Sequence, residues 1–141
     1  MFGFGVLLQL LDDLQDLQDD LDRGHSTIFT RQAQTGSLDE PTARLWSFAP
    51  VVLGSSARFA GARCEALQSL IHKNCKLMIL RTVARHHHFY SRAFLAELES
   101  SSPFGFEFLR RREQTVIEEC REALDSLRAR RRIASVFDLV A

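Results

Sequence analysis

The sequence predicts an all-α protein, a bundle of about five helices, and three observations support this fold class. Leu, Ala, Arg, Glu and Gln are abundant, and these residue types are good helix formers. Only three Pro and seven Gly interrupt the 141 residues. Apolar residues recur at three- and four-residue steps, which is the period of an amphipathic helix. A chain of this length makes one domain, so we expect residues 1–141 to form a single helical domain.

The first predicted helix, residues 4–23, carries two stripes of opposite character. At 100° per residue, its leucines share one side; they are Leu7, Leu10, Leu14, Leu17 and Leu21. The carboxylates share a wedge about 100° wide on the other side; they are Asp12, Asp13, Asp16 and Asp20, with Arg23 at the end. Gly24 is expected to end this helix as its carboxyl-terminal cap.

A stack of aspartates is costly in a helix. Like charges three or four residues apart repel, and Asp is a poor helix former. Short carboxylates one turn apart are suitable ligands for Mg²⁺, which keeps several waters and shares its shell with phosphate oxygens. The stripe therefore predicts either a Mg²⁺–diphosphate platform or a solvated acidic face on an amphipathic helix.

The segment 9–16, read as QxxDDxxD, and its continuation through residues 20–27 resemble the second aspartate-rich motif of class I isoprenoid synthases, the prenyl diphosphate, squalene–phytoene and terpene synthases. The resemblance implies that Asp12, Asp13 and Asp16 hold Mg²⁺ against an allylic diphosphate. It also implies substrate-binding roles, which fall on Gln9, Asp20 and Arg23. It covers most of the chain but only the carboxyl-terminal half of that family's fold, so we expect a partial domain.

The chemistry that the resemblance implies is metal-assisted loss of diphosphate from an isoprenoid diphosphate, followed by prenyl transfer or cyclisation. The family's first aspartate-rich motif is absent from these 141 residues. A transferase or lyase activity would then need a partner chain, or a homo-oligomer, to complete the fold. The alternative is a non-catalytic helical protein–protein interaction module whose aspartates face solvent or a partner.

The remaining chain predicts a loop over residues 25–37 and then four helices. The first covers residues 41–53, with Pro50 kinking or ending it. The next cover residues 62–85 and about 89–99. The last begins at Pro103, after Ser102 as its cap. Three consecutive histidines, His86, His87 and His88, point about 100° apart on a helix and cannot all bind one ion; a helix junction is the better interpretation.

Charge is unevenly distributed along the chain although its formal total is zero. Residues 1–40 hold eight acidic and two basic side chains, and residues 41–100 hold three acidic and eight basic ones. The arginine runs near the end are diluted by glutamates and lack interleaved aromatic residues, so we expect no nucleic-acid partner. Three cysteines without a CxxC pair or a secretory leader predict reduced thiols in the cytoplasm. No apolar run reaches the length of a transmembrane helix.

Overall fold

The computed structural model describes residues 2–56 and 65–137, with side chains for 2–55 and 65–127. These residues form seven α-helices, one short 3₁₀ helix and no strand, which confirms the all-α prediction for this part of the chain. The helices are α1 (Phe2–Gln15), α2 (Leu17–Arg23), α3 (Ile28–Thr35), α4 (Asp39–Ser56), α5 (Glu65–Arg85), η2 (His87–Phe89), α6 (Arg92–Ser100) and α7 (Phe106–Phe137). The expected number of about five was too low.

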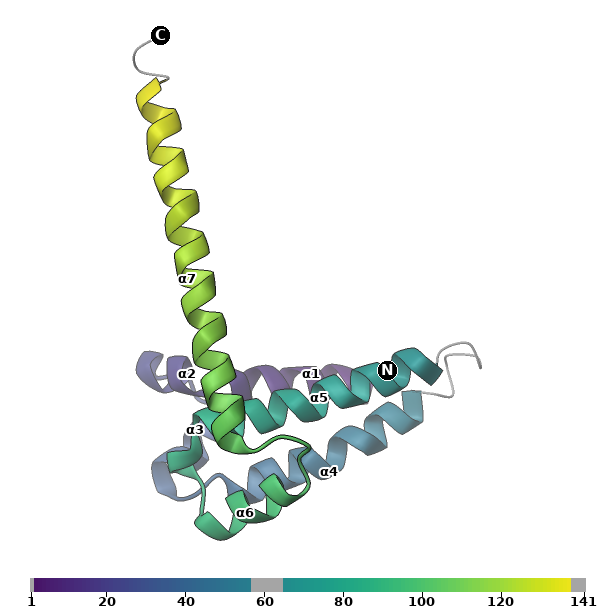
Figure 1. Ribbon diagram of the computed structural model, residues 1–141. Helices are drawn as coiled ribbons and strands as arrows, with labels where there is room; N and C mark the ends of the chain where they lie inside the picture. The colour runs from purple at the N-terminus through teal and green to yellow at the C-terminus, as the bar shows by residue number, and fades with distance from the viewer. Residues whose placement is uncertain (1, 57–64, 138–141) are drawn as a thin grey trace.

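Helices α1, α4 and α5 form the body of the molecule and run alongside one another (Figure 1). Helices α2 and α3 lie at one end of the body, and α6 lies beside it. Helix α7 packs by its first turns on α5 and then rises away from the body. The core is largely leucine, and its α1–α2 contribution comes from Leu7, Leu11, Leu14 and Leu17. The predicted leucine stripe is confirmed for Leu7, Leu14 and Leu17. Leu10 and Leu21 are only partly buried, and the buried Leu11 was not included in the predicted stripe.

The predicted first helix is divided at Asp16 into α1 and α2. The division is slight, because the Asp16 N–H donates to the Asp12 carbonyl at 2.9 Å and the Asp20 N–H donates to the Asp16 carbonyl at 2.8 Å. Carboxylates one turn apart therefore stay stacked across the junction. The helix ends at Gly24, whose φ of 72° is left-handed. The prediction of a glycine cap there is confirmed.

The loop expected over residues 25–37 was wrong, because α3 lies within it. Thr27 caps this helix: its hydroxyl accepts the Thr30 N–H at 3.2 Å, and the Thr30 hydroxyl accepts the Thr27 N–H at 2.8 Å. This reciprocal pair satisfies donors that a helix start would otherwise leave free. The cap fixes the chain that follows Gly24 against the acidic end of α2.

Two other helix limits differ from the prediction. Helix α4 runs to Ser56 with Pro50 inside it, so Pro50 does not end the helix. Helix α7 begins at Phe106 and not at Pro103. The Ser102 hydroxyl accepts the Phe104 N–H at 3.1 Å in a turn, and Glu99 Oε1 accepts the Phe106 N–H at 2.5 Å. A carboxylate from α6 therefore supplies the first acceptor of α7.

Within residues 2–56 and 65–137, no helix is long and apolar enough to cross a membrane. Cys75 is buried and Cys120 is exposed, and both are free thiols. Cys64 and the predicted start of the third helix at residue 62 lie outside the described residues.

Candidate functional site

Five of the six residues that the motif singles out meet in one shallow cavity of about 210 Å³. We call this cavity the acidic hollow. Its lining residues are Gln9, Asp12, Asp13, Asp16 and Asp20, together with His25 and Thr27. Arg23 is exposed on the last turn of α2 and is not among them. The hollow thus gathers carboxylates from both sides of the α1–α2 junction.

Two of the carboxylates already have side-chain partners. Gln9 Nε2 donates to Asp13 Oδ1 at 2.7 Å, and His25 Nδ1 lies 3.0 Å from Asp20 Oδ1. Gln9 therefore orients Asp13, and His25 lies beside Asp20 in the lining of the hollow. His25 was not among the site residues predicted from the sequence, and its contact with Asp20 makes it part of the site.

Asp12 and Asp16 are exposed and lie one helical turn apart on the open side of the hollow. In the described part of the chain, no group of three or more His, Cys, Asp or Glu side chains is arranged to hold a metal ion. Mg²⁺ usually takes only one or two carboxylates and fills its shell with water and phosphate oxygens. The described carboxylates therefore do not form a closed all-protein cage for a metal ion.

A basic side chain borders the acidic helix from α5. Burial and the neighbouring Arg81 lower the pKa of Arg85, while the negative charges of Asp16 and Asp19 act in the opposite direction. Arg85 is thus close enough to the α1–α2 junction to interact electrostatically with both Asp16 and Asp19. Arg85 was not among the site residues predicted from the sequence.

Arg85 also holds the base of α7. It pairs with Glu113 Oε1, and Arg81 Nη2 lies 3.8 Å from the same oxygen. Glu113 is only 6% exposed, and its Oε2 has no hydrogen-bond partner among the described residues. The sequence could not predict this contact, because 28 residues separate the two partners.

A second hollow of about 360 Å³ adjoins the acidic hollow and shares Gln9 and Asp12 with it. Its other lining residues are Gly5, Leu8, Leu11, Gln15 and Met78. We call it the apolar annex, because Leu8, Leu11 and Met78 contribute apolar side chains to its wall. A third and larger pocket of about 490 Å³, lined by Val6, Leu10 and residues of α3 and α4, opens on another side of α1.

The histidine triplet forms a helix junction, as predicted. His86 directly follows α5 and is only 5% exposed, whereas His87 and His88 are exposed in η2. Burial, with a further contribution from Arg85, lowers the pKa of His86 to about 4. His86 Nε2 is buried and has no hydrogen-bond partner among the described residues. A neutral, buried imidazole of this kind is a structural residue of the α5 end.

No protein-family model, curated protein or solved structure matches the chain.

Proposed function

We propose that the acidic hollow binds Mg²⁺ together with the diphosphate group of an isoprenoid diphosphate. The observation that carries this proposal is the meeting of Gln9, Asp12, Asp13, Asp16 and Asp20 around a single cavity. A stack of aspartates on one helix is electrostatically unfavourable by itself. A divalent cation bridging them to a diphosphate would relieve that repulsion and neutralise both anionic partners.

The apolar annex supports the choice of an amphiphilic ligand. It shares Gln9 and Asp12 with the acidic hollow, so a diphosphate beside Asp12 would have Leu8 and Met78 next to it. Apolar side chains at that position favour a hydrocarbon tail over a sugar or a nucleoside. When bound, Mg²⁺ would stabilise the negative charge that the departing diphosphate gains as its bond to the allylic carbon breaks.

We infer that this chain alone binds the diphosphate. Catalytic turnover would then need an assembly that covers the side of α1 carrying the acidic hollow. Asp12, Asp16 and Leu8 are exposed, so water would reach an allylic carbocation formed beside them. The reaction of class I isoprenoid synthases requires that water be excluded from such a carbocation. The proposal therefore predicts binding without efficient catalysis for the chain alone.

Binding is tested by thermal unfolding with Mg²⁺ alone, pyrophosphate alone, and the two together. A ligand at about a hundred times its Kd stabilises the folded state by about 2.7 kcal/mol, which raises the Tm by several degrees. We expect that rise only with both components present. The double variant Asp12→Asn/Asp16→Asn should lose it, since Asn keeps the shape of the side chain and removes the charge.

The matched control is Asp22→Asn. Asp22 accepts a hydrogen bond from Gln18 at 3.0 Å with the same i,i+4 spacing as the Gln9–Asp13 pair, but it lies outside the acidic hollow. Its substitution should leave the Mg²⁺–pyrophosphate shift intact. An equal loss of the shift in both variants would mean that the ion binds the helix as a diffuse negative surface, and the proposal would fail.

The tail is tested separately with geranyl diphosphate in place of pyrophosphate. We expect a larger shift with the prenyl compound, and Leu8→Gln should reduce it to the pyrophosphate value. If geranyl diphosphate and pyrophosphate stabilise the wild-type chain equally, the apolar annex has no part in binding.

A further inference from the structure

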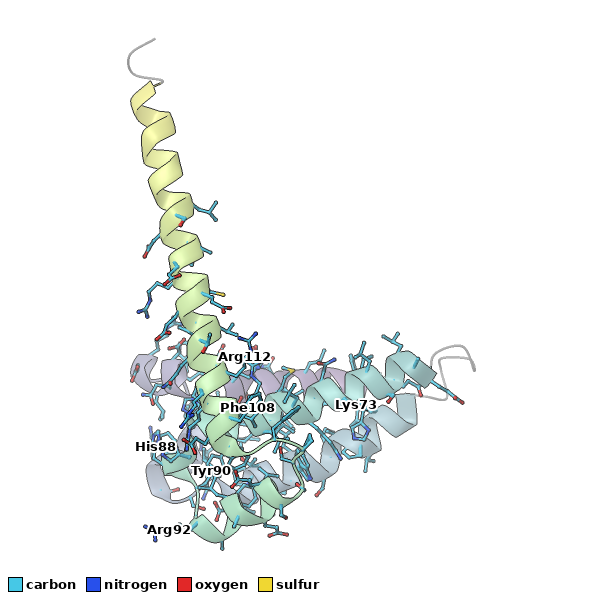
Figure 2. The ribbon with its side chains drawn as sticks, in the orientation of Figure 1. Lys73, His88, Tyr90, Arg92, Phe108 and Arg112 are labelled. Carbon is cyan, nitrogen blue, oxygen red and sulfur yellow. The ribbon has the colours of Figure 1, made fainter. Side chains whose placement is uncertain are left out.

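Glu113 marks the place where α7 leaves the body. Among the α7 side chains that the structure describes, residues 106–127, Glu113 is the last that is buried, after Phe106 and Leu109. Figure 2 shows the side chains of α7 above Arg112 standing apart from the other helices. Residues 106–113, which we call the anchor of α7, therefore end on a charged residue, although an apolar one would be buried there without the cost of removing a charge from water.

The carboxylate of Glu113 depends on arginine side chains of α5. Glu113 is only 6% exposed, its Oε1 contacts Arg85, and Arg81 Nη2 lies 3.8 Å from the same oxygen. Its Oε2 has no hydrogen-bond partner among the described residues. A buried carboxylate that loses its cationic partner is strongly destabilised, because its charge is then left uncompensated. The stability of the anchor therefore depends on how firmly Arg85 is held at this oxygen.

Arg85 is attracted by two sets of negative charges. Its side chain is 44% exposed, so packing does not confine its guanidinium, whereas Glu113 is fixed by burial. Burial and the neighbouring Arg81 lower the pKa of Arg85, and the charges of Asp16 and Asp19 oppose that shift. Both aspartates are exposed on the α1–α2 segment, and α1 packs against α5. One mobile cation thus lies between a buried anion that needs it and exposed anions that also attract it.

We propose that Glu113 and the acidic α1–α2 junction compete for Arg85, so that neutralising the acidic hollow stabilises the anchor of α7. Asp16 connects the two places, since it lines the acidic hollow. A buried ion pair contributes little net stability compared with apolar packing, and its best-attested use is to specify or switch an arrangement. The coupling is reciprocal: loss of the Glu113 charge would leave Arg85 to the junction.

The competition does not need a bound ligand, because a substitution can neutralise Asp16. A divalent cation bound at the acidic hollow would act in the same way, and the anchor of α7 would then respond to occupancy of the hollow. This second statement rests on the proposed function. The competition itself rests on the position of Arg85 between Glu113 and the junction.

The test is native-state hydrogen exchange on the full chain without Mg²⁺ or pyrophosphate. A detached anchor would be an isolated helix, which is marginal in water, so exchange of its amides measures how often it opens. Asp16→Asn should slow this exchange about two- to fivefold, the effect of strengthening one ion pair. Asp12→Asn is the matched control, because Asp12 lines the same hollow one helical turn farther from the junction, and it should leave the anchor unchanged.

A general gain in stability is separated from the competition by a second background. Arg85→Gln/Glu113→Gln removes the contested cation together with the buried charge, so no carboxylate is left uncompensated. In this background Asp16→Asn should no longer slow exchange of the anchor, although any slowing in the buried part of α4 should remain.

The control background is Glu107→Gln/Arg111→Gln, which removes an exposed ion pair from the same helix, and here the effect of Asp16→Asn should persist. The proposal is overturned if Asp16→Asn does not slow exchange of the anchor in the wild-type background, if Asp12→Asn slows it equally, or if the effect survives Arg85→Gln/Glu113→Gln. If Asp16→Asn acts as expected but Mg²⁺ with pyrophosphate has no effect on the anchor or on the Tm, the competition is supported and the proposed ligand site fails.

Discussion

Replacement of Asp16 by Asn should stabilise the ligand-free protein. Asp16 has four carboxylate neighbours at three- or four-residue spacing, namely Asp12, Asp13, Asp19 and Asp20. The backbone hydrogen bonds that continue through Asp16 keep these neighbours in helical register. Each like-charge pair on an exposed helix costs about 0.2–0.5 kcal/mol, so the four together cost about 0.8–2 kcal/mol.

One attraction opposes this gain. The negative charge of Asp16 also acts on Arg85, and an ion pair exposed to solvent contributes about 0.2–1 kcal/mol. Asn occupies the same volume and is as good a residue at a helix start as Asp, so the fold should not change. The net expectation is an increase in the free energy of unfolding of about 0.5–1 kcal/mol. Asp12→Asn removes only one such pair, that with Asp16, and should gain about 0.2–0.5 kcal/mol.

Urea unfolding followed by circular dichroism measures both variants against the wild type. The gain should be largest at low ionic strength and should shrink as salt screens the exposed charges. Addition of Mg²⁺ and pyrophosphate should reverse the order of stability, since the wild type alone keeps the full set of carboxylates. If Asp16→Asn destabilises the ligand-free chain, or if its effect does not respond to salt, the carboxylate stack is not strained and the argument for a bound cation is lost.

Two further predictions concern the body. Thr42 Oγ1 and Tyr90 Oη lie 3.0 Å apart, and both residues are buried. Tyr90→Phe should lower the free energy of unfolding by about 1–2 kcal/mol, because it leaves the threonine hydroxyl without this partner. In a double-mutant cycle, Thr42→Val/Tyr90→Phe should cost less than the sum of the single changes, and strict additivity would show that the contact contributes nothing. The second prediction is a loss of stability in acid. The pKa of His86 is about 4 in the folded protein, against an ordinary value of 6.5. As the pH falls, the unfolded chain therefore takes up a proton before the folded one does. The contribution of His86 to stability is complete above pH 6.5 and declines as the pH falls toward 4. The pKa shift limits this loss in the free energy of unfolding to about 3 kcal/mol, and solvent screening reduces it to about 1–2 kcal/mol. Urea unfolding at about pH 7 and about pH 4.5 should show the loss in the wild type and in His87→Gln, but not in His86→Gln.

Local signals in the sequence were sufficient for some helix limits and misleading for others. Gly24 was predicted correctly as a cap, because its left-handed conformation is one that glycine adopts freely. Helix α3 was missed because its cap is a Thr27–Thr30 pair, which lacks the glutamate or glutamine of the usual capping box. The predicted start at Pro103 was wrong because Glu99, in a different helix, supplies the acceptor that starts α7 at Phe106.

The site was predictable to the extent that it belongs to one helix. The side of α1–α2 that carries Asp12, Asp16 and Asp20 follows from the helical period alone, and these residues do line one hollow. The approach of Arg85 to this helix and its pairing with Glu113 depend on how α5 and α7 pack. Contacts between distant segments are set by tertiary packing, on which the helical period carries no information.

Helix α7 packs on the body by its first turns and extends away from it, so a small tilt at its base would displace its far end by a much larger distance. From Glu113 to the end of the helix at Phe137, the rise of 1.5 Å per residue gives an arm of about 36 Å. A tilt of about 10° at the base would move the far end by about 6 Å for an arm of that length. Any event that redistributes Arg85 between Glu113 and the α1–α2 junction would therefore be amplified along the arm, and a distance probe far from the body would detect a rearrangement too small to see where it begins.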